Sequence, residues 1–128
     1  MKKRFRLRKN SDFQRVRREG CSWTHPLLVL CVLRNNLRYS RFGFSASKRV
    51  GGAVVRNRAR RLMREATRLR QAMIADGWDM VIIARQPMRE ADFHQVDRAV
   101  AQLLRRARLL GEAEETTGDG LPTALPES

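Results

Sequence analysis

The segment that follows Gly51-Gly52 separates its charged and apolar side chains onto opposite sides of a helix. With Arg56 at zero and about 100° per residue, an arc of about 40° to 140° is basic. It holds Arg60, Arg64, Arg68, Arg61 and Asn57. An arc of about 220° to 340° is apolar. It holds Ala59, Leu62, Met63, Ala66, Leu69 and Met73. Such a helix must cover its apolar arc with a core and leave its basic arc accessible.

Two arginines of this helix depart from the separation. Arg58 lies at the border between the two arcs, and Arg70 falls within the apolar one. We expect Arg70 to extend its charge to the surface along its aliphatic stem, or to lie where the helix leaves the core.

The basic arc has almost no acidic neighbours, because Glu65 is the only acid between Arg34 and Arg70. A solvated helix surface usually mixes signs, whereas like charges repel unless an external anion neutralises them. The whole chain carries +14, and residues 1–20 and 34–70 supply the excess. Arginine binds phosphate through its planar fork, so we expect a polyanion, and a folded or single-stranded RNA in particular.

The remaining pattern predicts a single domain with mixed helices and strands. An S-x-x-Q capping box at Ser11 predicts a first helix that Gly20 ends. The apolar run Leu27–Leu33 predicts a buried strand, with Arg38–Ser47 as its antiparallel partner. Residues 80–84 predict a further strand, and a second capping box at Asp92 predicts a last helix up to about residue 107. Residues 111–128 hold five acidic and no basic side chains, and we expect a disordered tail.

Several classes of protein are disfavoured. The basic start leads into Asn10-Ser11-Asp12, and the longest apolar run has seven residues, so we expect a cytoplasmic protein with no membrane partner. Cys21 and Cys31 have no partner pair at metal-ligand spacing, so we expect no metal site. No Ser-His-Asp set, P-loop or acidic cluster is recognisable, so we assign no catalytic residue to the chain.

The residues from Ser45 to Glu65, with Arg56-Asn57-Arg58 at their centre, resemble the signature of the bacterial ribonuclease P protein family. Leu7–Phe13 and Met80–Arg85 support this resemblance, which covers about residues 5–110. It implies an α+β fold, a single-domain α/β sandwich of order αβββαβα, with a four-stranded sheet and a left-handed βαβ crossover. The corresponding domain is residues 1–110.

The resemblance also implies a function. The protein would be a subunit of ribonuclease P that binds the catalytic RNA and the 5′ leader of precursor tRNA and promotes removal of the leader. It would have no obligate protein partner. Mg²⁺ held mainly by the RNA would carry the hydrolysis. A rival reading is a ribosomal or RNA-chaperone protein that binds structured RNA without turnover.

Carried over by position, one set of residues would face the catalytic RNA: Arg56, Asn57, Arg58, Arg60, Arg61, Arg64 and Arg68. A cleft between the first helix and the sheet would hold the leader, with Phe13, Arg17, Lys48 and Arg49 along it. Two positions depart from the family. Arg17 stands where many relatives have a second aromatic residue, and Cys31 where many have tyrosine, which indicates a more electrostatic contact with the leader.

Overall fold

The computed structural model describes residues 1–111 of the chain. Three helices and four strands follow one another in the order αβββαβα, as the resemblance implies. They are α1 (Asn10–Glu19), β1 (Cys21–Thr24), β2 (Leu28–Arg34), β3 (Arg41–Ser45), α2 (Ala53–Arg70), β4 (Trp78–Ala84) and α3 (Phe93–Arg106). The acidic tail expected at residues 111–128 lies, apart from Gly111, outside the described residues. The Gly111 amide donates to the Met73 carbonyl, so this first tail residue contacts the domain.

The four strands form one sheet in the order β1-β2-β4-β3. β2 pairs antiparallel with both β1 and β4, whereas β3 pairs in parallel with β4. The expectation that Arg38–Ser47 would be the antiparallel partner of Leu27–Leu33 is therefore wrong. The more apolar β4 takes the place beside β2, where strands covered on both faces are favoured, and β3 is left at the edge.

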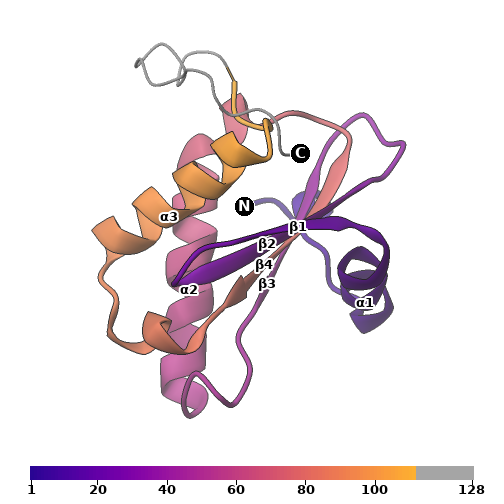
Figure 1. Cartoon of the computed structure of the whole chain (residues 1–128). Helices are drawn as coiled ribbons and strands as arrows, with labels where there is room; N and C mark the ends of the chain where they lie inside the picture. Colours follow the sequence, from indigo (N-terminus) through magenta and orange to yellow (C-terminus); the bar gives the residue numbers. More distant parts are fainter. Residues whose placement is uncertain (112–128) are drawn as a thin grey trace.

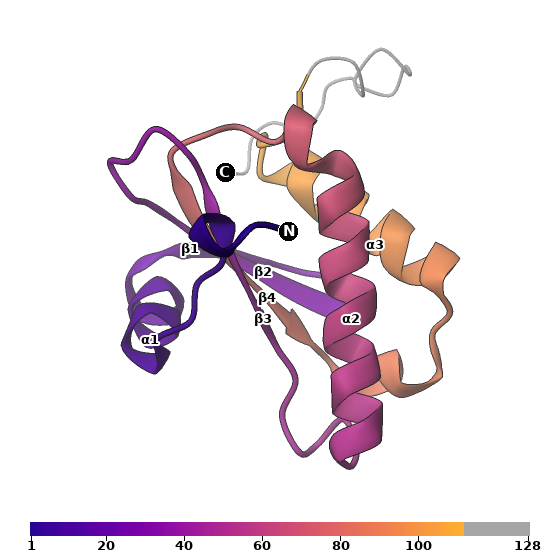
Figure 2. The same ribbon diagram turned by 180° about the vertical axis from the view of Figure 1, so that it is seen from behind.

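The sheet separates two layers of helices (Figures 1 and 2). α2 and α3 cover one face, which carries the main core, including Leu30, Phe42, Met80 and Ile82. α1 alone lies on the other face, over a smaller apolar cluster of Leu7, Val16, Cys31 and Val81. Because one short helix spans less of a sheet than two longer ones, part of the second face is left open.

The buried side of α2 is rotated from the predicted apolar arc. Leu69, predicted inside, is 55% exposed, while Thr67 is fully buried together with Ala59, Met63 and Ala66. The centre of the buried side lies near 325° rather than 280°, a rotation of about 45°. Thr67 tolerates burial because its hydroxyl donates to the Met63 carbonyl at 2.9 Å. The same rotation carries Arg70 onto α3, where it pairs with the Asp97 carboxylate instead of extending into solvent.

The two predicted capping boxes have different outcomes. Asp92 caps α3 as predicted, because its carboxylate accepts from the Gln95 amide and the Gln95 side chain accepts from the Asp92 amide. Ser11 does not cap α1. That helix begins at Asn10 with Lys9 as its N-cap residue, and no side chain caps it. Cys31 is buried in β2 as expected, and Cys21 is exposed at the start of β1; neither forms a disulfide.

Candidate nucleic-acid interface

The basic side of α2 has partly buried arginines, Arg56, Arg60 and Arg64, beside the exposed Arg61 and Arg68. The Arg64 guanidinium lies 5.8 Å from the centre of the Phe44 ring, and its Nε is buried with no hydrogen-bond partner. Burial, followed by the charges of Arg6, Arg60 and Arg61, lowers the pKa of this guanidinium. Four cations therefore share one surface, and each of the other three disfavours the charge on Arg64.

The other predicted residues of α2 are not equivalent to Arg64. Asn57 accepts a hydrogen bond from Arg60, which fixes the side chains of both residues on the exposed surface. Arg68 pairs with Glu65, so much of its charge is already compensated. Arg56, like Arg64, has a buried Nε without a partner.

Arg58 lies on another flank of the helix. Viewed down the helix axis, it lies about 200° from Arg56. Its guanidinium donates to the Ala91 carbonyl at 2.8 Å, next to the start of α3. The structure therefore brings Arg60, Arg61 and Arg64 together and places Arg58 apart from them.

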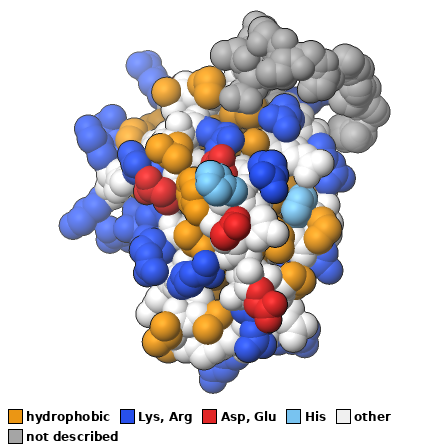
Figure 3. All heavy atoms as spheres, turned by 90° about the vertical axis from the view of Figure 1, so that its left-hand side faces the viewer, with side chains coloured by type: hydrophobic (Ala, Val, Ile, Leu, Met, Phe, Trp, Pro, Cys, Tyr) orange, Lys and Arg blue, Asp and Glu red, His pale blue; other side chains and the backbone are white. Residues whose placement is uncertain are grey.

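The acidic and basic side chains are unevenly distributed over the helical layer (Figure 3). Lysine and arginine crowd along the edge of this view that α2 forms, whereas acidic, basic and apolar side chains mix in its middle. The view agrees with the contacts described above. The strongest positive field of this layer belongs to α2 and the segment around Arg6.

The open face of the sheet lies beside α1. A row of residues crosses the sheet there in register: Thr24 is opposite Val29, Val29 opposite Ile83, and Ile83 opposite Ser45. None of the four is buried, and Val29 and Ile83 are partly buried against the cluster under α1. The chain thus offers a partly apolar strip along the edge of α1. The resemblance implied a cleft between this helix and the sheet but did not indicate these four residues.

Two of the predicted leader-contacting residues adjoin this strip. The Phe13 ring lies so close to Gly43 that a Cβ there would stand 2.5 Å from its Cζ. Gly43 is two residues before Ser45, on the same face of β3. The charge of Arg17 acts on Cys31, which is two residues after Val29 in β2. Phe13 also packs on the cluster under α1, so it has a structural role as well as an accessible edge.

Lys48 and Arg49 are exposed in the turn that follows β3. β3 ends at Ser45, so this turn continues from the end of the strip. Phe13 and Arg17 therefore lie on the α1 side of the sheet, whereas Lys48 and Arg49 lie in the turn that joins β3 to α2.

A buried ionic network anchors α1 to the sheet, and no sequence pattern indicated it. Asp79 of β4 is fully buried. Its carboxylate accepts from Arg41 Nε at 2.9 Å and NH2 at 2.7 Å, and from the Asn35 amide at 2.9 Å. Arg15 of α1 reaches the same carboxylate at 3.5 Å. In the sequence, Asp79 is only a single acidic residue at the start of an apolar strand. Its role can be recognised only when the fold places that strand beside Arg41.

Comparison with known proteins identifies the family of the chain. The family model described as Ribonuclease P matches residues 1–108. The chain belongs to the ribonuclease P protein family.

Curated relatives and a solved structure agree with this assignment. The ribonuclease P protein component of Roseiflexus castenholzii is 49% identical over 120 residues, which cover 93% of this chain and 98% of the relative. That of Chloroflexus aurantiacus is 44% identical over 129 residues, covering 99% and 96%. The Staphylococcus aureus RNase P protein aligns with a TM-score of 0.77 at 31% identity, covering 84% of this chain and 98% of that structure.

Membership in the ribonuclease P family gives the chain its role. It is a subunit of the ribonucleoprotein endoribonuclease that matures the 5′ end of tRNA, and its partner is the ribonuclease P RNA. None of the helices in residues 1–111 is long and apolar enough to cross a membrane.

Proposed function

We propose that the protein binds its two RNA ligands on opposite sides of the sheet. The catalytic RNA contacts the α2 side through Arg56, Asn57, Arg60, Arg61, Arg64 and Arg68, with Arg58 adding charge from the flank. The observation that carries this proposal is the group formed by Arg64 with Arg6, Arg60 and Arg61, whose mutual repulsion an RNA backbone would relieve.

The leader of precursor tRNA lies on the other side, in our proposal, along the strip from Thr24 to Ser45. Phe13 offers an aromatic edge to its bases, and Arg17, Lys48 and Arg49 offer charge to its phosphates. Stacking and backbone contacts tolerate any sequence, which suits a leader whose sequence varies between tRNAs.

The chemistry of cleavage rests, in our proposal, on Mg²⁺ held by the RNA in a cytoplasmic holoenzyme. Within residues 1–111, no three His, Cys, Asp or Glu side chains come together as metal ligands. The part of this chain is to hold the RNA and the leader in a fixed relative position.

A reconstitution with two substrates tests this assignment. Purified protein is added to its cognate RNA in Mg²⁺, and the affinity for precursor tRNA is measured with a long leader and with a one-nucleotide leader. We expect the protein to raise the affinity for the long leader more than for the short one. Equal effects on both would contradict the leader site. Cleavage by the protein alone, after ribonuclease treatment of the preparation, would contradict the assignment of the chemistry to RNA.

A further inference from the structure

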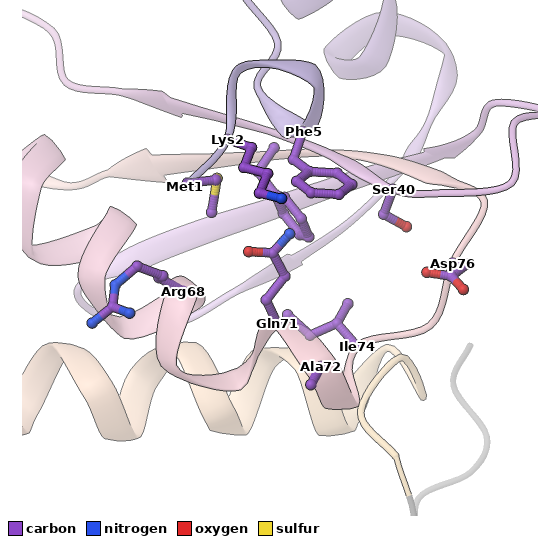
Figure 4. A pocket seen from close by; sticks show the side chains of 10 residues that line it. Met1, Lys2, Phe5, Ser40, Arg68, Gln71, Ala72, Ile74 and Asp76 are labelled. Atoms are coloured by element: carbon purple, nitrogen blue, oxygen red, sulfur yellow. The ribbon is translucent and has the colours of Figure 1, made fainter.

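A cavity at the carboxyl end of α2 shares only Arg68 with the two surfaces described above. It has a volume of about 580 Å³, within the range of small-molecule sites, and lies between the N-terminal segment, the start of β3 and the turn after α2. Met1, Phe5 and Ile74 give it apolar walls, and Lys2, Arg68 and Gln71 line it with polar groups. Figure 4 shows Gln71 reaching toward Lys2 and Phe5, with Arg68 on one side and Asp76 on the other.

The polar groups of the cavity differ in whether they are already engaged. The Ser40 hydroxyl donates to the Ala75 carbonyl at 2.7 Å and accepts from the Trp78 amide at 3.0 Å, so it holds the wall in place. Within residues 1–111, the Gln71 amide and the Asp76 carboxylate have no hydrogen-bond partner. Gln71 can therefore offer both a donor and an acceptor to a ligand.

The aromatic wall is held in position. The Phe5 ring meets the Tyr39 ring edge to face, with centroids 5.6 Å apart, and the Arg4 guanidinium lies 4.9 Å from its centre. A fixed aromatic ring beside an amide suits a planar ligand that carries hydrogen-bonding groups at its edge. A nucleobase has this chemistry.

The position of the cavity indicates where such a base would come from. Counted around the axis of α2 from Arg56, Gln71 lies at about 60°, an angle between those of Arg60 and Arg64. The cavity therefore continues the basic side of the helix. The opposite rim belongs to the N-terminal segment, in which residues 1–9 hold six basic and no acidic side chains. An RNA backbone that follows α2 therefore passes the mouth of the cavity with cations on both sides.

We propose that this cavity receives an unstacked base of the catalytic RNA. The base lies beside Phe5, the Gln71 amide bonds to its edge, and Lys2 and Arg68 contact the flanking phosphates. This inference rests on the proposed binding of the catalytic RNA to α2. It adds one site of base recognition to a surface that otherwise contacts the backbone.

Chemical probing of the RNA in the assembled complex tests the proposal. Dimethyl sulfate and a carbodiimide reagent together report the hydrogen-bonding edges of the four bases. The catalytic RNA is probed alone, with the wild-type protein, with Gln71→Leu, and with Gln102→Leu as a matched control on the exposed side of α3. We expect one unpaired base to be protected by the wild-type and control proteins and reactive with Gln71→Leu. The affinity of Gln71→Leu for the RNA should fall about three- to tenfold.

A photo-crosslinking amino acid at the exposed Ala72 provides a second measurement that does not depend on the folding of Gln71→Leu. We expect it to crosslink to the protected base. Identical reactivity with Gln71→Leu and with the wild-type protein, or a crosslink only to base-paired positions, would overturn the proposal. Failure of the wild-type protein to bind the RNA would instead overturn the proposed function, so the two failures are distinguishable.

Discussion

Replacing Arg64 should separate RNA binding from protein stability. Arg64→Ala removes the arginine that is surrounded by Arg6, Arg60 and Arg61. If it contacts one phosphate, the plot of log affinity against log salt concentration should become less steep by about 0.9. At 0.1 M salt this corresponds to about 1.2 kcal/mol, or roughly eightfold in affinity for the catalytic RNA.

The stability of the free protein should change little in the same variant. Loss of the Phe44 contact costs about 0.5 to 1 kcal/mol, and relief of the repulsion from three cations opposes that loss. We expect the free energy of unfolding in urea to stay within about 1 kcal/mol of the wild type.

Arg58→Ala is the matched control, because it removes the same type of side chain six residues earlier, on another flank of the helix. It loses the hydrogen bond to the Ala91 carbonyl, and we expect a destabilisation of about 1 to 2 kcal/mol. The slope of its log affinity for the catalytic RNA against log salt concentration should change by less than half as much as that of Arg64→Ala. The assays are filter binding between 50 and 400 mM salt and urea unfolding. Equal changes of slope in the two variants, or a larger loss of stability in Arg64→Ala, would refute this reasoning.

Three further outcomes are expected. Phe13→Leu keeps an apolar group against Gly43 but loses the ring, so the binding free energy of the holoenzyme for precursor tRNA with a long leader should weaken by about 1 to 3 kcal/mol, while that for precursor tRNA with a one-nucleotide leader should not change. Equal losses for the two substrates would exclude the strip as the leader site. Asp79→Asn leaves Arg41 without its charged partner and should lower the free energy of unfolding by about 3 kcal/mol, against no change for the exposed Glu90→Gln; similar unfolding curves would show that the network is dispensable. Removal of residues 112–128 takes away five acidic side chains and should leave the melting temperature unchanged while tightening RNA binding slightly at low salt; a large drop in melting temperature would show that the removed segment stabilises the domain.

Local signals in the sequence predicted most of the elements but not their pairing. The run Leu27–Leu33 and the Asp92 capping box could each be recognised from a short stretch of sequence, because the residues that form each pattern are close together in the chain. β1 left no such signal, since its four residues are mostly exposed, and only the resemblance supplied a third strand before α2. The place of β3 beside β4 depends on contacts across the whole of α2, which no local window contains.

The candidate site shows the same limit. The angular pattern of charged and apolar residues predicted the basic side of α2. It did not predict that the helix is rotated so that Thr67 is buried and Leu69 is exposed. The rotated helix also places Arg70 against Asp97 of α3, a partner 27 residues away that a local pattern does not contain. The resemblance implied a cleft beside the first helix, but the residues of the strip from Thr24 to Ser45 could not be predicted, because their exposure depends on how much of the sheet α1 covers.

The central position of β4 has a consequence for synthesis of the chain. Among residues 1–111, β4 is the only strand that pairs with β3, and β4 is made after the whole of α2. A ribosome therefore releases the arginine-rich segment before the strand that completes the sheet exists. During that interval the β1–β2 hairpin is the only strand pair of the sheet that can form, while the cations of the nascent chain already attract any nearby RNA. Selectivity for one RNA must then arise after residue 84 has emerged, when parallel pairing fixes α2 on the sheet and its arginines become a single rigid surface.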